Sequence, residues 1–171
     1  MVTIIDFVTL VFAYAVPMYF ANATPIVIHG KKPIDFGKKI GKKRIFGDGK
    51  TVLGTFSGIG GGIVAGIVLL FFYPTIEILV PNYFLFAVAL SVGAILGDML
   101  KSFIKRRAGI ESGAHWLLFD QLDFVLGGLL LSLIVRVPEL EVAAFLLIAT
   151  IVIHLATNFA AFKMKLKKVP W

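Results

Sequence analysis

The chain has 171 residues, of which 58% are apolar, and it carries a formal net charge of +7 at pH 7. Its mean hydropathy of +0.93 excludes an ordinary soluble domain and indicates an integral membrane protein. Cysteine is absent, which excludes disulfides, thiolate metal sites and cysteine nucleophiles. Because the basic residues lie between apolar segments, we expect lipid headgroups and phosphate substrates, and no nucleic acid, as partners.

The apolar segments predict an all-α fold with five transmembrane helices. A helix needs about 20 apolar residues to cross a bilayer. Segments of suitable length span residues 3–23, 55–73, 83–100, 117–135 and 142–162. The first lacks the basic start and the cleavage pattern of a signal peptide, so we expect it to remain in the mature protein.

The distribution of lysine and arginine predicts the orientation, because short basic loops stay on the cytoplasmic side. Nearly all of these residues lie in segments 24–54 and 101–116 and in the tail, and only Arg136 lies elsewhere. We therefore expect the N-terminus outside, the C-terminus in the cytoplasm, and 24–54 and 101–116 as cytoplasmic loops.

Three aspartates are predicted to lie at the same membrane depth. Asp98 ends the third span, and Asp120 and Asp123 begin the fourth. If the third helix continues past residue 100, Asp98 and Lys105 share one of its faces, with Lys101 beside them. Ionisable groups at this depth are usually functional. The junction between these spans is therefore the candidate site.

A second candidate segment begins the span at 55–73. It reads G-K-T at Gly49, Lys50 and Thr51, but Arg44 stands where a phosphate-binding P-loop requires glycine, and no strand is indicated before it. What remains is a lysine and a threonine at a helix N-terminus, where free N–H groups favour an anion. The alternative is a helix cap with an interfacial lysine. The regular spacing of the glycines that follow predicts close helix packing: Gly54, Gly58, Gly62 and Gly66, with Gly93 and Gly97 on the next span.

Carboxylates beside lysine and arginine are typical of a site that handles a nucleoside triphosphate. Mg²⁺ prefers one or two carboxylates together with phosphate oxygens, and cations neutralise the remaining phosphate charge. The alternative interpretation is an ordinary positive-inside loop beside acidic residues that stabilise a helix start.

The order of these motifs resembles the CDP-diacylglycerol synthase superfamily. The motifs are G-K-T-x-x-G-x-x-x-G from Gly49, G-D-x-x-x-S-x-x-K-R-x-x-G-I from Gly97, and D-x-x-D from Asp120. The short chain with D-Q-L-D is similar to the archaeal, CDP-archaeol synthase branch. The resemblance covers about residues 47–128. Residues 111–119 depart from the K-D and P-G-H-G-G signature of bacterial members, so no role is carried over to them.

The resemblance implies that residues 1–171 form one membrane-embedded catalytic domain, with its active site on the cytoplasmic side of the cell membrane. It would transfer a cytidylyl group from CTP to an unsaturated isoprenoid ether-lipid phosphate, with Mg²⁺ as cofactor and pyrophosphate as product. We expect Asp98, Asp123 and Asp120 to hold the metal and, with Lys105, to be catalytic. The expected phosphate-binding residues are Gly49, Lys50, Thr51, Lys105 and Arg106. Lys101 and Arg107 are expected only to steer anions.

Two other functions fit parts of the sequence. A small transporter or channel for an anionic substrate would also carry charges in its spans, but near the midplane and with an internal repeat. Another CDP-lipid transferase, the CDP-alcohol phosphotransferase, would need D-G-x-x-A-R and a wider spacing than that of Asp120 and Asp123. A homodimer is compatible with the sequence.

Overall fold

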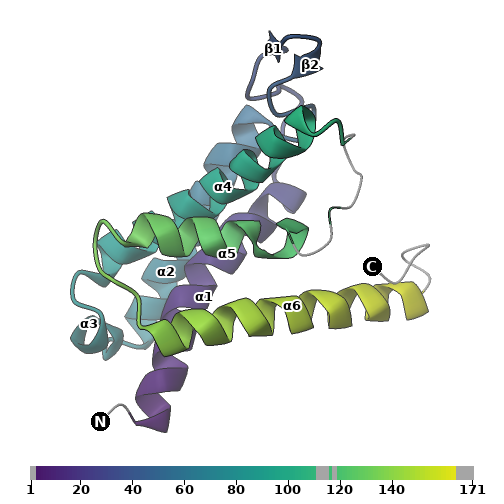
Figure 1. Ribbon diagram of the computed structural model, residues 1–171. Coiled ribbons are helices and arrows are strands. Elements are labelled where there is room, and N and C mark those ends of the chain that lie inside the picture. The colour runs from purple at the N-terminus through teal and green to yellow at the C-terminus, as the bar shows by residue number, and fades with distance from the viewer. Residues whose placement is uncertain (1–2, 111–115, 117–118, 165–171) are drawn as a thin grey trace.

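The computed structural model describes residues 3–110, 116 and 119–164 and is mostly helical (Figure 1). Its helices are α1 (Ile4–Val27), α2 (Val52–Phe72), α3 (Ile76–Leu79), α4 (Tyr83–Arg107), α5 (Phe119–Ser132) and α6 (Leu140–Lys163). Two short strands, β1 (Lys39–Ile40) and β2 (Lys43–Arg44), form an antiparallel hairpin. In the described part of the chain, α1, α2, α4 and α6 are long and apolar enough to cross a membrane. The chain is therefore a multi-pass membrane protein.

Several boundaries differ from those predicted. The segment 24–54, expected to be a loop, begins with the last turn of α1 and contains the hairpin. The segment 101–116 begins as helix, because α4 continues to Arg107. α5 has 14 residues, or about 21 Å at 1.5 Å per residue, which is shorter than the 30 Å hydrocarbon layer. The part of 111–119 that departs from the bacterial signature lies largely outside the described residues.

Small residues set how closely the helices pack. The predicted glycine face of α2 is confirmed, since Gly54, Gly58, Gly62 and Gly66 are all buried. A Cβ added at Gly62 would lie 2.5 Å from the Pro17 carbonyl oxygen of α1, closer than real Cβ contacts come. The prediction for α4 is also confirmed, because a Cβ at Gly97 would lie 2.1 Å from the Asp123 carbonyl oxygen of α5. This contact places the backbone of the two acidic motifs side by side.

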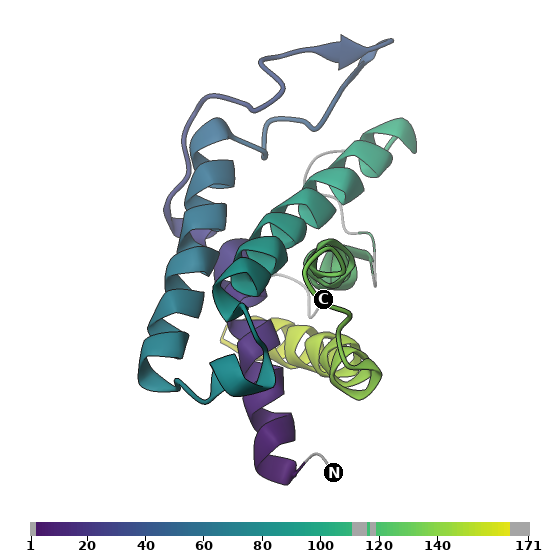
Figure 2. The ribbon, with the colours of Figure 1, turned by 90° about the vertical axis from the view of Figure 1, so that its left-hand side faces the viewer.

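The helices form a bundle of α1, α2 and α4, and α5 and α6 cross it at a steep angle (Figures 1 and 2). Bulky side chains fill the centre. Tyr14, Phe86 and Phe124 are almost fully buried, and the ring centroids of Tyr14 and Phe86 lie 4.7 Å apart. Apolar side chains such as Phe71, which is 77% exposed, cover the outside, as expected of a surface that faces lipid.

The hairpin is built around the buried carboxylate of Asp35. Its oxygens accept hydrogen bonds from the Arg44 guanidinium at 2.5 Å and from the backbone N–H groups of Gly37, Phe46 and Gly47. Burial alone would raise the pKa of Asp35, but the bonds from Arg44 and the backbone hold it well below its ordinary value. Arg107 of α4 donates to three hairpin carbonyl oxygens. The hairpin is therefore fixed to the end of α4.

A second polar network lies at the opposite end of the bundle. Arg136 pairs with Glu139 and donates to the Leu79 carbonyl oxygen at 2.5 Å, while Tyr14 of α1 donates to Glu139. The network joins α1 to the segments before α4 and α6. Arg136, which the charge pattern set apart from the other basic residues, has a structural role here.

Candidate active site

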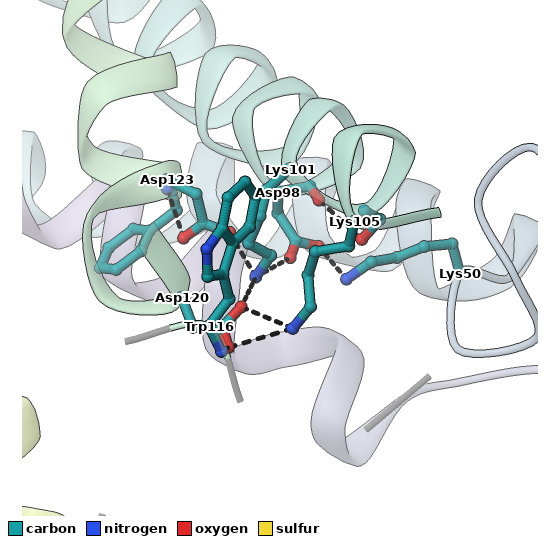
Figure 3. Close-up of polar contacts among 9 residues, drawn as sticks. Lys50, Asp98, Lys101, Lys105, Trp116, Asp120 and Asp123 are labelled. Carbon is teal, nitrogen blue, oxygen red and sulfur yellow. Dashed lines mark hydrogen bonds and ion pairs between the residues drawn. The ribbon is translucent and has the colours of Figure 1, made fainter. Parts of the chain in front are cut away.

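Charged side chains from three segments meet where α4 and α5 cross (Figure 3). Asp98 and Lys101 come from α4, Asp120 and Asp123 come from the first turns of α5, and Lys50 comes from the residue before the N-cap of α2. The sequence predicted that the three aspartates would lie together, and the structure brings all three to one ammonium group. α4 does continue past residue 100, and it carries Lys105 to the same place.

Lys101 occupies the centre of the cluster, which the sequence analysis did not predict. Its Nζ atom lies 2.6 Å from Asp123 Oδ2, 3.2 Å from Asp98 Oδ1 and 3.4 Å from Asp120 Oδ1. The expectation that this lysine only steers anions is therefore wrong, because its ammonium group binds all three carboxylates. The available signal was its position three residues after Asp98, which puts both on one helix face.

Two further lysines complete an alternating chain of charges. Lys50 pairs with Asp98, and Lys105 Nζ lies 3.0 Å and 3.1 Å from the two carboxylate oxygens of Asp120. The backbone N–H of Trp116 donates to Asp120 at 2.6 Å and holds that carboxylate in place. Three carboxylates and three ammonium groups thus balance in charge. Such balance is what allows ionised groups to lie inside a membrane protein.

Much of the cluster is shielded from solvent. The side chains of Asp123 and Lys105 are 6% and 8% exposed, and that of Lys101 is 15% exposed. Asp123 Oδ2 is buried, and its partner among the described residues is the Lys101 ammonium group, 2.6 Å away. A carboxylate oxygen with unused acceptor capacity in such a site is suited to binding a cation.

The donor atoms fit a hard divalent cation, but the site is not a closed cage of carboxylates. Among the described residues, no three acidic or histidine side chains are grouped to hold one metal ion. The three aspartates instead surround the Lys101 ammonium group. One or two of these carboxylates, with phosphate oxygens from a substrate, match the coordination that Mg²⁺ prefers.

The predicted phosphate-binding residues do not all reach the cluster. Lys50 and Lys105 do, and Gly49 and Thr51 line a cavity of about 480 Å³ beside Asp98. Arg106 makes no ion pair with the acidic residues that the structure describes, and its buried Nε has no partner there. Arg107 binds the hairpin backbone and so has a structural role, and its expected role in steering anions stays a prediction.

Comparisons with known proteins agree with this arrangement. A family model described as CarS-like, CDP-archaeol synthase, matches residues 1–171. A CDP-archaeol synthase of Pyrococcus abyssi is 43% identical over 165 residues, covering 94% of this chain and 96% of the relative. One of Methanospirillum hungatei is 39% identical and covers 91% of this chain and 99% of the relative.

A solved structure described as an intramembrane enzyme for archaeal membrane lipid biosynthesis is also similar. It matches with a TM-score of 0.79 and 35% identity, covering 91% of this chain and 94% of that one. Sequence and fold agree over nearly the whole length. The chain therefore belongs to the CDP-archaeol synthase family, whose members are membrane-bound cytidylyltransferases.

Proposed function

We propose that this protein transfers a cytidylyl group from CTP to the phosphate of an unsaturated isoprenoid ether lipid, forming a CDP-lipid and pyrophosphate. The observation that carries the proposal is the cluster of three carboxylates and three ammonium groups in a chain of this family. A transporter would need charges near the membrane midplane. Here the charges gather at the hairpin end of the bundle.

The reaction needs positioning more than it needs a protein nucleophile. An oxygen of the lipid phosphate attacks the α-phosphorus of CTP and forms a new P–O bond. The bond between the α-phosphorus and the oxygen that bridges to the β-phosphorus breaks, and pyrophosphate leaves with that electron pair. Both reactants are ionised near neutral pH, so the protein has to align them and neutralise their charge.

The residues of the cluster divide between metal and phosphate binding in this proposal. Asp98 and Asp123 hold Mg²⁺, and Asp120 is either a third ligand or an orienting group. The metal, when bound, neutralises charge on the triphosphate. The residues that bind the triphosphate and the lipid phosphate are Lys50, Lys105, Arg106, Thr51 and the backbone of Gly49. When a phosphate replaces the carboxylates as its partner, the Lys101 ammonium group becomes a further phosphate ligand.

The chain is proposed to cross the membrane five times, with the N-terminus outside and both the C-terminus and the site on the cytoplasmic side. The support is the distribution of basic residues, since an odd number of crossings puts all three basic segments on one side. The four long apolar helices are consistent with this topology, and α5 would supply the remaining crossing.

A single assay tests the proposed function. Purified protein with Mg²⁺ is given each of the four nucleoside triphosphates and either an ether or an ester lipid phosphate, and pyrophosphate release is measured. We expect release with CTP and the ether lipid phosphate, and none when the lipid is omitted. Failure to release pyrophosphate with CTP would overturn the proposal, and uptake of a labelled anion without CTP consumption would favour a transporter.

A further inference from the structure

The cavity beside Lys50 extends from the charge cluster toward the bilayer. It has a volume of about 480 Å³ and lies between the second half of α1, the start of α2, and α4. Asp98 and Lys50 line its charged end, and Ile95 lines it one turn deeper along α4. Below it, a Cβ at Gly58 would lie 2.5 Å from Ile95 Cδ1. The packing of α1, α2 and α4 therefore closes the floor.

The rim of the cavity is amphiphilic. Ile26, on the membrane-spanning helix α1, lines the cavity and is 76% exposed, so this side opens to lipid. His29 and Asp48, which also line it, are exposed near the hairpin. A ligand with a charged head and an apolar tail gains from both sides. A nucleotide, which has no apolar tail, gains little from the side at Ile26.

Two polar side chains in the cavity have hydrogen-bonding capacity that the described residues do not use. The hydroxyl oxygen of Thr51 accepts from the Gly54 and Gly30 N–H groups, but its proton has no acceptor among the described residues. The side-chain amide of Asn22, which also lines the cavity, makes no hydrogen bond to any residue that the structure describes. Asn22 lies within the membrane-spanning helix α1, where a polar group is costly without a partner, so a ligand is the natural partner for its amide. The Thr51 hydroxyl, at the N-cap of α2, can donate to the same ligand.

The positions of Asn22, Lys50 and Thr51 along the cavity determine which part of the ligand lies at each of them. Asn22 lies five residues before the end of α1 at Val27, which places it about 8 Å from the loop end of that helix. It is therefore on the membrane side of Lys50 and Thr51. An amphiphile with its phosphate at Lys50 would bring the segment between head and tails to Asn22.

We propose that this cavity binds the head of the acceptor, a lipid phosphomonoester. The Lys50 ammonium group and the Thr51 hydroxyl bind the phosphate, and the Asn22 amide donates to an oxygen of the glycerol segment. The acceptor enters from the bilayer past Ile26, which leaves the Lys105 end of the cluster for the nucleotide. This inference rests on the function proposed above and adds to it a separate binding site for the lipid.

The test separates the two substrates kinetically. Asn22→Leu and Asn22→Ala are compared with wild type by pyrophosphate release, varying the lipid phosphate at saturating CTP and then CTP at saturating lipid phosphate. We expect the KM for the lipid phosphate to rise about tenfold, the cost of one buried hydrogen bond, with the KM for CTP within twofold of wild type. Ile26→Lys should likewise raise only the KM for the lipid.

Ala23→Leu provides the matched control. Ala23 is exposed, lies one residue from Asn22 on the same helix and does not line the cavity, so the change should leave both KM values unchanged. A rise in the KM for CTP in the Asn22 variants would assign the cavity to the nucleotide and overturn the inference. Unchanged KM values for both substrates would also overturn it. A wild-type protein that releases no pyrophosphate would instead refute the proposed function itself.

Discussion

The ammonium group of Lys101 is the counter-ion of three carboxylates, and its removal should expose their mutual repulsion. In Lys101→Met, Asp98, Asp120 and Asp123 lose their shared partner. Removing one partner of a buried ion pair lowers the free energy of unfolding by about 3–5 kcal/mol. We therefore expect a clear fall in the unfolding temperature in detergent without Mg²⁺. Millimolar Mg²⁺ should restore much of the lost thermal stability of the variant, whereas it should raise the unfolding temperature of wild type less. An equal response of both proteins to Mg²⁺ would contradict the assignment of a cation site here.

The two proposed metal ligands give a prediction about turnover. Asp98→Asn and Asp123→Asn keep the size of the side chain but remove its charge. Loss of one ligand or charge-stabilising group typically costs about 10²–10³ in rate, so we expect pyrophosphate release to fall by at least that factor. Circular dichroism should show an intact fold.

A suitable control for these variants lies far from the cluster. Glu141→Gln removes a carboxylate from the exposed first turn of α6 and should leave turnover unchanged. Near wild-type turnover in either aspartate variant would contradict the assignment of Asp98 and Asp123 as metal ligands.

At the scale of single residues, the sequence predicted the acids better than the bases. Carboxylates at a membrane boundary are rare and therefore informative, which is why Asp98, Asp120 and Asp123 could be predicted. Lysines are common in every cytoplasmic loop, so Lys101 could not be distinguished from its neighbours by charge alone. Its role depends on a contact between two helices, and no local pattern encodes that contact.

The contact of α4 with α5 depends on a glycine with no room for a side chain. Gly97→Val should push α5 from α4 and separate Asp98 from Asp123, because the new Cβ would lie 2.1 Å from the Asp123 carbonyl oxygen. Overpacking of this kind lowers the free energy of unfolding by about 1–3 kcal/mol. We expect both the unfolding temperature and turnover to fall.

Gly60→Val is the matched control for that change. Gly60 lies within α2, is exposed, and has nothing within 4 Å of an added Cβ. This variant should behave like wild type in both measurements. If Gly97→Val behaved like Gly60→Val, the backbone contact would not be what aligns the site.

The hairpin should be stable at neutral pH and weaken in acid. Because the pKa of Asp35 is lowered in the folded chain, its ionisation stabilises the hairpin fully above the ordinary value of 3.8. That stabilisation declines as the pH falls below this value toward the lowered pKa. Asp35→Asn should lose it already at pH 7, so we expect faster trypsin cleavage at the hairpin lysines there. Equal cleavage of variant and wild type would argue against this role.

At the scale of elements, hydropathy predicted the long helices because each is apolar over most of its length. The hairpin was not predicted, since its order depends on the contacts of Asp35 with Arg44 and of Arg107 with the hairpin backbone. The predicted span ended at residue 100, seven residues before the end of α4 at Arg107. Its last turns are basic and amphipathic, so they fall below the hydropathy that marks a span, although the helical spacing of Asp98 and Lys105 anticipated them.

For the whole molecule, the absence of cysteine allows a clean test of topology. Lys42→Cys in the hairpin and Val137→Cys before α6 are both exposed positions at opposite ends of the molecule. With the site on the cytoplasmic side, a membrane-impermeant maleimide should label Lys42→Cys only in inverted vesicles and Val137→Cys only in right-side-out ones. Labelling of both from one side would refute the proposed orientation.

The placement of Asp98 and Lys101 on one helix bears on how the protein is made. α4 is synthesised before α5, so it enters the bilayer while Asp120 and Asp123 are still absent. Asp98 and Lys101, three residues apart, already neutralise each other within that helix. When α5 follows, its two carboxylates bind the ammonium groups of Lys101 and Lys105. The order of the charges along the chain thus lets α4 enter the bilayer with Asp98 already paired, and assembly of the bundle with α5 completes the site.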